Sequence, residues 1–399
     1  MKHLFPGATG HFSLIQGCYW MTYCILISFS SLYLLDRGFT NTQIGLLLGI
    51  AGLTAAILQP FVGAKGDHLK VLSLRQFTSL PIAAMILCGV GLFLVPAKPI
   101  QAALYMLLLV LLQLLTPLIY SLGMDCLNNH IELNFGLARG IGGGTYALAS
   151  AVCGSLAAAL GARVIPLVLV VAVALMLAFT FTFRQGGPVK STLPKPDALP
   201  QSDGTPFLKK YPQVLPLLIG VILLYTSHNV IMNFPYQIVR SLGCGSAEMG
   251  HYLTLQSLMD IPAMVVFSLL LKRASSRAWV RLTGISFFLH ALLTWLAPNL
   301  PFLMVVQVFE MSGYALYSVS SVYFVNEMVD LCDRVQGQTY FTMANTIGIV
   351  LSSVLGGRLL DLGGASAALC LATVTGAAGM VILWFLLRRK SLRPATNAA

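Results

Sequence analysis

The chain has 399 residues, of which 57% are hydrophobic and 9% charged, with a mean hydropathy of +0.82 and a formal net charge of +11. Because soluble domains carry about 25% charged residues, this composition excludes an ordinary soluble protein and predicts a membrane protein with many spans. The basic charge alone would suit a nucleic-acid-binding protein, but the positions of the charges argue against that class.

Twelve apolar runs are long enough to cross a bilayer, for which about 20 residues are needed. In chain order they are 12–34, 42–64, 74–95, 101–125, 138–160, 164–183, 213–236, 249–271, 279–297, 301–326, 338–360 and 366–387. The breaks between them are short, except for a proline-rich stretch that has no apolar period. The sequence therefore predicts an all-α polytopic membrane protein with twelve transmembrane helices, arranged as an N-terminal six-helix half (1–184), a cytoplasmic linker (185–212) and a C-terminal six-helix half (213–399).

The basic residues are distributed unevenly between the two predicted sides of the membrane. Of the 24 lysines and arginines, 18 fall on the side of the N-terminus, five fall on the opposite side and Arg139 lies at the start of a span. The positive-inside rule then places both termini in the cytoplasm and the protein in the cell (cytoplasmic or inner) membrane, with no nucleic acid as partner. The first run is expected to be retained rather than removed as a signal peptide. The eight cysteines form no CxxC pair, so no metal or other cofactor is expected.

Two pairs of short segments suggest an internal repeat. "GFTNTQIG" at 38–45 is similar to "GCGSAEMG" at 243–250, and "TYALASAVCG" at 145–154 is similar to "TYFTMANTIG" at 339–348. Each pair stands at corresponding places in the two predicted halves. Repeated halves around a central site are typical of secondary transporters.

Two acidic residues lie near the middle of predicted spans, where a charged side chain costs about 2.5–3.5 kcal/mol. Glu310 lies about ten residues into its run and shares a helical face with Gln307 and Tyr314. Asp260 follows Gln256 by one turn. Both acids are therefore functional candidates, although a structural hydrogen bond between helices remains an alternative for each.

A third charge near the membrane is Arg139, which stays protonated in proteins and needs a partner inside a membrane. Asp125 is the nearest candidate in sequence, and Asp260 is a second candidate. Alternatively, Asp125 and Arg139 lie at the cytoplasmic interface and extend into water. Three further polar and aromatic candidates for a solute site are Trp20, Tyr23 and Asn229.

Three stretches resemble a known family. "TQIGLLLGIAGLTAAILQPFVGAKGD", "NFGLARGIGGGTYALAS" and "VFEMSGYALYSVSSVYF" are similar to major facilitator superfamily transporters. Within that superfamily they resemble the lactose permease-like branch, which comprises proton-coupled oligosaccharide, nucleoside and phenylpropionate-type symporters. The resemblance covers nearly the whole chain and implies the major facilitator fold.

The resemblance also implies roles for single residues. Glu310 falls on the glutamate that carries the coupled proton, and Asp260 falls near the acid that joins solute binding to coupling. Tyr146 occupies the position of an aromatic residue that stacks on sugar in galactoside carriers. Two positions depart from the branch: His290 stands where it has an arginine, and Gln307 stands where galactoside carriers have a histidine.

The predicted function is secondary active transport, namely proton-coupled symport of a small polar organic solute such as a sugar, glycoside or nucleoside by alternating access. An uncoupled facilitator, or an exporter or drug antiporter of the same fold, is the main alternative. An enzyme is not expected, because neither HExxH nor GxSxG occurs, and the repeat argues against a channel. The expected partners are solute, protons and the lipid bilayer, and the protein is expected to be a monomer.

The candidate residues form three sets. The proton-coupling set is Glu310, His290 and Asp260; the solute-binding set is Asp125, Arg139, Tyr146, Trp20, Tyr23, Asn229, Gln256, Gln307 and Tyr314; the gating set, implied by the resemblance, is Gly63, Asp67 and Lys70.

Overall fold

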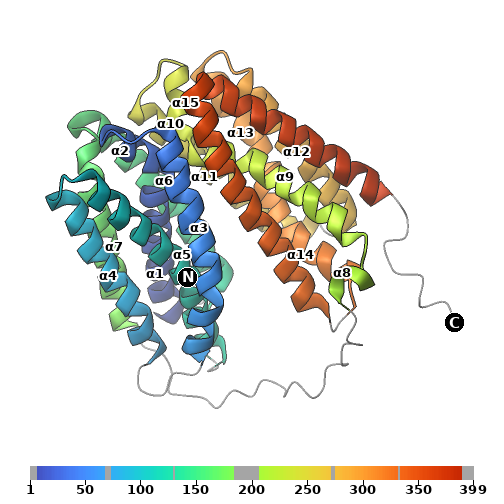
Figure 1. Cartoon of the computed structure of the whole chain (residues 1–399). Helices are drawn as coiled ribbons and strands as arrows, with labels where there is room; N and C mark the ends of the chain where they lie inside the picture. Colours follow the sequence, from blue (N-terminus) through green and yellow to red (C-terminus); the bar gives the residue numbers. More distant parts are fainter. Residues whose placement is uncertain are drawn as a thin grey trace. The chain divides into compact units, whose positions relative to one another are not determined.

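A computed structural model describes residues 7–67, 73–128, 131–183, 206–270, 275–330 and 333–388. Within these ranges every regular element is a helix and none is a strand (Figure 1). Eight of the described helices are long and apolar enough to cross a membrane, or nine if one bent pair counts as a single span. The predicted all-α polytopic fold is thus confirmed.

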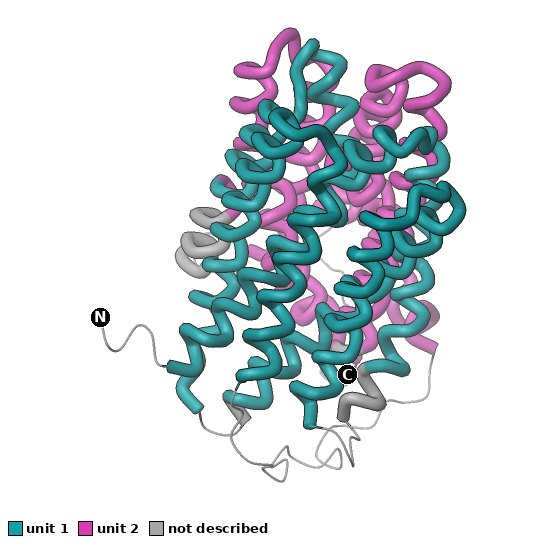
Figure 2. Tube along the Cα trace, turned by 90° about the vertical axis from the view of Figure 1, so that its left-hand side faces the viewer, with its two compact units in different colours: residues 1–192, 233–258 teal, residues 193–232, 259–399 magenta. Residues whose placement is uncertain are grey.

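The chain divides into two compact units (Figure 2). Unit 1 comprises residues 1–192 and 233–258, and unit 2 comprises residues 193–232 and 259–399. Unit 1 therefore includes a segment that follows the predicted linker in sequence. The predicted boundaries of the halves at 184 and 213 stay a prediction, since most of the linker lies outside the described residues.

Unit 1 is a bundle of helices built mainly from the first part of the chain. Its elements are α1 (Gly7–Tyr23), the π-helical η1 (Cys24–Ser28), α2 (Ser30–Asp36), α3 (Asn41–Asp67), α4 (Leu74–Leu94), α5 (Lys98–Asn128), α6 (Phe135–Leu160), the 3₁₀ turn η2 (Ala162–Val164), α7 (Ile165–Thr182), α10 (Pro235–Ser241) and the first half of α11 (Ser246–Leu270). Helix α1 packs on α6 and α7, while α4 and α3 pack on α5. Helix α1 is thus covered by helices that come much later in the chain.

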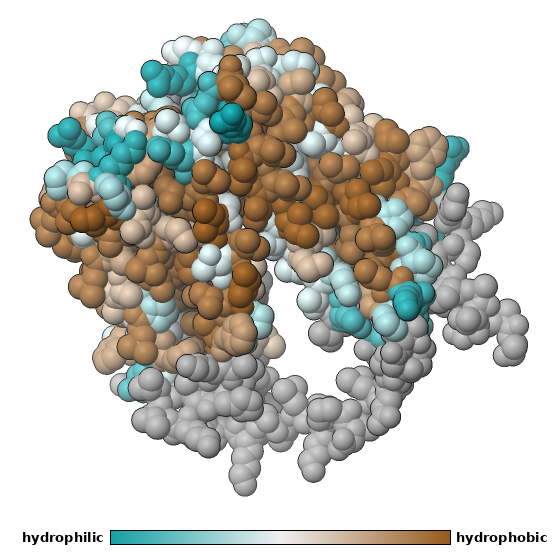
Figure 3. Space-filling model, viewed as in Figure 1, coloured by the Kyte–Doolittle hydropathy of each residue, from teal (hydrophilic) through white to brown (hydrophobic). Residues whose placement is uncertain are grey.

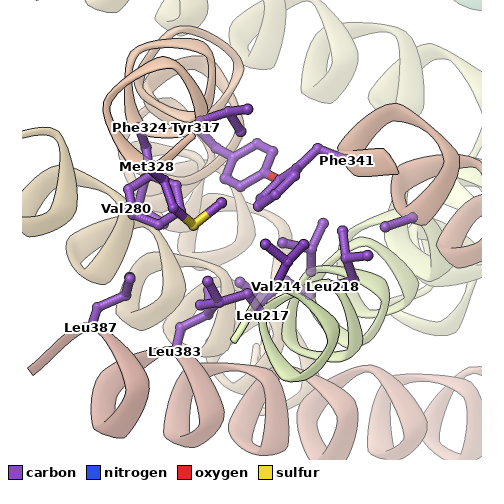
Figure 4. Packing of buried hydrophobic residues seen from close by; sticks show 14 of the residues in the cluster. Val214, Leu217, Leu218, Val280, Tyr317, Phe324, Met328, Phe341, Leu383 and Leu387 are labelled. Carbon is purple, nitrogen blue, oxygen red and sulfur yellow. The ribbon is translucent and has the colours of Figure 1, made fainter. Parts of the chain in front are cut away.

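Unit 2 contains the remaining helices. They are α8 (Phe207–Lys210), α9 (Val214–Asn233), the second half of α11, α12 (Ser276–Trp295), α13 (Leu300–Glu310), the π-helical η4 (Met311–Ala315), α14 (Leu316–Met328) and α15 (Arg334–Arg388). Helix α12 lies centrally, because it packs on α13, η4, α14 and α15. Figure 4 shows part of the core, in which Leu217, Phe324 and Leu383 from three different helices meet.

The predicted apolar runs coincide with helices, but two of them are not single straight helices. The first run is divided among α1, η1 and α2, with a bend of 48°. The tenth run consists of α13, η4 and α14, so that a π-helical turn interrupts it directly after Glu310. The last two runs form the continuous α15, in which Gly363 and Gly364 have non-helical backbone angles and separate the two predicted spans.

The internal repeat is visible in the backbone before α3 and α11. Gly38 and Gly243 both have φ of +77°, a conformation that residues with a side chain rarely adopt. Two residues further on, the Thr40 amide donates to Gln43, and at the matching place the Gly245 amide donates to the Glu248 carboxylate at 2.9 Å. Both helices therefore begin with the same turn and the same type of cap.

The second pair of repeated segments shares close helix packing. A Cβ added at Gly154 would lie 2.7 Å from the Ser246 carbonyl oxygen, and one added at Gly348 would lie 2.8 Å from the Ile222 carbonyl oxygen. Each glycine thus lets its helix approach the backbone of a neighbour: α6 approaches α11, and α15 approaches α9. The two final glycines of the sequence repeat therefore have the same structural use.

The outer surfaces of the helices are apolar, as Figure 3 shows for one face. Large hydrophobic side chains such as Leu87, Val305 and Phe61 are 75%, 70% and 67% exposed. In water such a surface would be costly, whereas lipid tails cover it without penalty. The surface agrees with a membrane setting for the chain.

Candidate functional site

A buried cluster of one carboxylate and two imidazoles lies inside unit 2. The Oε2 atom of Glu310, at the end of α13, lies 3.3 Å from Nδ1 of His228 on α9 and 3.4 Å from Nδ1 of His290 on α12. All three side chains are at least 95% buried. The structure thus brings together Glu310 and His290, two residues of the predicted proton-coupling set, and adds His228, which the sequence analysis missed.

Aromatic rings surround His228. Its imidazole stacks on Tyr314 with ring centroids 4.9 Å apart and planes within 6° of parallel. The edges of Tyr225 and Phe287 lie against it, with centroids 6.2 and 5.4 Å away. These rings fix the plane of the imidazole.

The local backbone explains why Glu310 and Tyr314 serve the same cluster. Tyr314 lies in the π-helical η4, the turn that follows Glu310, and such turns are frequent at functional sites. Gln307, one turn before Glu310, is fully buried, and its amide donates to the Leu303 carbonyl at 3.1 Å. Glu310 and Tyr314 thus both contact His228.

In unit 1 the predicted arginine lies against aromatic side chains. The guanidinium carbon of Arg139 lies 3.8 Å from the centroid of the Trp20 ring, a close cation–π contact. The Tyr23 ring lies 5.1 Å from that of Trp20. Gly142, one turn after Arg139, makes room for this arrangement, because a Cβ there would lie 2.5 Å from Trp20. Three predicted solute residues on α1 and α6 thus form one cluster.

The described contacts of the other predicted solute residues are local to their own units. The hydroxyl of Tyr146 lies 2.6 Å from that of Ser28, and the amide of Asn229 donates to the carbonyl of Tyr225 on its own helix. Gln256 is buried in the unit 1 part of α11, and Asp125 is half-buried near the end of α5. Asp260 is half-buried in the unit 2 part of α11. Their predicted roles stay predictions.

The gating set falls where the structure gives little information. Gly63 and Asp67 lie in the last turns of α3, but their side chains are outside the described residues, and Lys70 lies outside them altogether. The gating role implied for these three residues therefore stays a prediction.

A polar network that the sequence analysis did not single out joins α8 to the connection between α14 and α15. The Lys210 ammonium lies 2.7 Å from Asp333 and 3.1 Å from Asp330, and the Tyr211 hydroxyl donates to both carboxylates. The hydrogen bond to Asp333 raises the pKa of Lys210, and burial raises the pKa of Tyr211. The network holds α8 in place and uses two acids that carry no proposed transport role.

Comparisons with known proteins bear on the family and the fold. A sequence model of the MFS_1 like family matches residues 13–370. The structure is similar to that of a single-residue mutant of the nucleoside transporter NupG, at 14% identity and a TM-score of 0.79 over 96% of this chain and 99% of that chain. It is also similar to a POT family transporter in complex with 5-aminolevulinic acid, at 12% identity and a TM-score of 0.75 over 96% of both chains.

A third similar structure is an auto inhibited POT family peptide transporter, at 11% identity and a TM-score of 0.71 over 99% of both chains. At these identities the likeness shows the fold alone. A search of curated proteins finds no match. The predicted resemblance to major facilitator transporters is confirmed at the level of family and fold.

Proposed function

The chain belongs to the MFS_1 like family, and from this premise we propose that it is a secondary active transporter that couples the movement of a small polar organic solute to protons. Transport rather than catalysis is the activity that this family implies. The proposal includes alternating access between the two sides of the membrane, with the protein acting as a monomer.

The observation that carries the proposal is Glu310 between two imidazoles. A carboxylate inside a membrane protein is costly and marks a proton or ion path by default. The protonated acid is tolerated in such an interior. The ionised acid is tolerated when an imidazole beside it has taken up the proton, because the imidazolium then carries the compensating positive charge. Glu310 with His290 therefore has the chemistry of a coupling site, and Asp260 is the second acid proposed to take part.

The solute is proposed to contact the cluster of Trp20, Tyr23 and Arg139 in unit 1. A guanidinium offers paired hydrogen bonds to hydroxyl, carbonyl or carboxylate oxygens, and an indole offers a flat face for a sugar or base. A sugar, glycoside or nucleoside fits this chemistry, and one similar structure is titled a nucleoside transporter. Thermal-shift screening of the purified protein against sugars, nucleosides and aromatic acids identifies the class by the compounds that raise its melting temperature.

The coupling role is tested with Glu310→Gln in proteoliposomes, using a solute found in that screen. Glutamine mimics the protonated acid, so exchange and counterflow should continue while accumulation driven by a pH gradient should stop. Glu327→Gln is the matched control, because Glu327 binds Ser276 near the far end of α14, away from the cluster. Accumulation that persists in Glu310→Gln would contradict the proposal and make Asp260 the next candidate.

The alternative is an uncoupled facilitator or an exporter of the same fold. In that case the parent protein would show the same counterflow with and without a pH gradient. Loss of exchange, accumulation and thermal stability together in Glu310→Gln would indicate that the acid serves only to hold helices together.

The proposed location is the cell (inner) membrane with both termini in the cytoplasm. Reporter tags inserted at residues 195–205 and at the C-terminus are expected to be accessible only from the cytoplasmic side. A tag accessible from the outside at either place would contradict this topology.

A further inference from the structure

The two imidazoles beside Glu310 have nearly the same distance to its Oε2 atom but different surroundings. His290 is 1% exposed, whereas His228 is 5% exposed and stacks on Tyr314, which is only half-buried. From the half-buried Tyr314, contacts lead to His228 and then to Glu310. Among the described contacts of the cluster, the side of His228 and Tyr314 is therefore the one that reaches a partly exposed side chain.

In the described helices α9, α12, α14 and α15, the charged residues other than the two histidines lie toward helix ends. On α12, Arg281 lies nine residues before His290, about 13 Å along the helix, and its guanidinium lies 5.4 Å from the Trp384 ring. Arg277 lies one turn further away. On α15, the charged residues lie at the ends of its two helical stretches: Arg334, Arg358, Asp361 and Arg388. In the described ring contacts, the phenols Tyr225 and Tyr314 lie against His228, and Tyr317 lies against Tyr225.

The cluster has zero net charge when it holds one proton. This proton gives either a carboxylic acid with two neutral imidazoles, or a carboxylate with one imidazolium and one neutral imidazole. Moving the proton between Glu310 and an imidazole therefore changes no net charge, which matters because net charge is expensive in an interior of low dielectric constant. An imidazole can take a proton at one ring nitrogen and release the proton at the other.

We propose that His228 is the residue through which the coupled proton enters and leaves Glu310, while His290 holds the carboxylate in position. In loading, Nε2 of His228 takes a proton from water, and Nδ1 gives its own proton to Oε2 of Glu310. A neutral imidazole and a carboxylic acid result, and release reverses both transfers. This inference rests on the proposed coupling role of Glu310 and adds a residue to that site.

The experiment follows the carboxyl of Glu310 directly and needs no solute. Purified protein is subjected to a rapid drop in pH, and the carbonyl stretching band of the protonated carboxyl is followed by infrared spectroscopy. The band that is absent in Glu310→Gln belongs to Glu310. His228→Gln is expected to slow the appearance of this band by at least about tenfold. His290→Gln, the matched variant, is expected to change how much of the band appears at a given pH rather than its rate.

Each outcome decides between the two proposals. If Glu310→Gln removes no band, Glu310 does not take up a proton and the proposed coupling site is wrong. If it removes a band but His228→Gln leaves the rate unchanged, or slows it no more than His290→Gln, only the role of His228 is wrong. If His228→Gln does not fold, Tyr314→Leu decides, because removing the stacked ring should speed the band's appearance; an unchanged rate overturns the inference. Tyr317→Leu, whose ring packs on Phe287, controls for loss of an aromatic ring.

Discussion

Replacement of Gly154 by alanine tests the crossing of α6 and α11 within unit 1. The added Cβ would lie 2.7 Å from the Ser246 carbonyl oxygen and 2.8 Å from the Gly250 Cα. Because both atoms belong to the backbone, no side chain can rotate away, and the helices would have to separate by about 0.7 Å or more to restore a normal contact. Such overpacking typically costs about 1–3 kcal/mol, more than the roughly 1 kcal/mol that alanine gains over glycine in a helix.

Gly144→Ala is the matched control for this variant. It changes a glycine of the same helix, but a Cβ at Gly144 would meet no atom within 4 Å. Scanning fluorimetry in detergent should therefore give a melting temperature below that of the parent protein for Gly154→Ala, and one equal to or above it for Gly144→Ala. A Gly154→Ala protein that melts at or above the parent temperature would refute the tight crossing.

Three further variants test other parts of the structure. Arg139→Lys should fold normally but lose at least about tenfold in solute affinity by calorimetry, because lysine cannot copy the planar fork over Trp20; unchanged affinity would instead place Arg139 at the membrane interface. Backbone amides hold the pKa of Glu248 below its usual range. The ionised carboxylate therefore stabilises the fold above the pKa of about 4.3 that it has in the unfolded chain, and this stabilisation is lost as pH falls through the folded-state pKa. The melting temperature of Glu248→Gln should be slightly below the parent's at pH 7 and equal to it in acid. Asp333→Asn should speed tryptic cleavage after Lys210, because it removes the ion pair between the two side chains. This ion pair raises the pKa of Lys210, so the difference in cleavage rate between variant and parent should be complete at neutral pH and fade only as pH rises through that raised pKa.

The helices and the buried place of Glu310 inside a span could be predicted from the sequence because each depends on local patterns. Apolar runs of about 20 residues mark the spans, and a lone acid inside such a run marks Glu310. His228 could not be placed in the same way, because its contact with Glu310 depends on α9 lying beside α13. A histidine inside an apolar run was nevertheless a signal that the rule for intramembrane ionisable residues would have found.

The partner of Arg139 illustrates the same limit. Asp125 was the nearest candidate in sequence, and that pairing stays a prediction. The contact that the structure describes is with Trp20, about 120 residues earlier in the chain, on a helix that α6 packs against. The π-helical turns at η1 and η4 were also beyond prediction, since they change helical register without any glycine or proline signal that is specific to them. Distances between helices, and hence the clusters themselves, depend on tertiary packing.

The membership of residues 233–258 in unit 1 determines how the gene can be divided. A fragment that ends in the proline-rich stretch encodes a unit 1 without α10 and the first half of α11, and so leaves the α6 backbone around Gly154 without its neighbour. A chimera that exchanges the second half with a relative keeps that contact only if the donor also has a glycine at the position of Gly250. Chimeras should therefore take α6 and residues 246–258 from the same parent, so that this backbone crossing is kept.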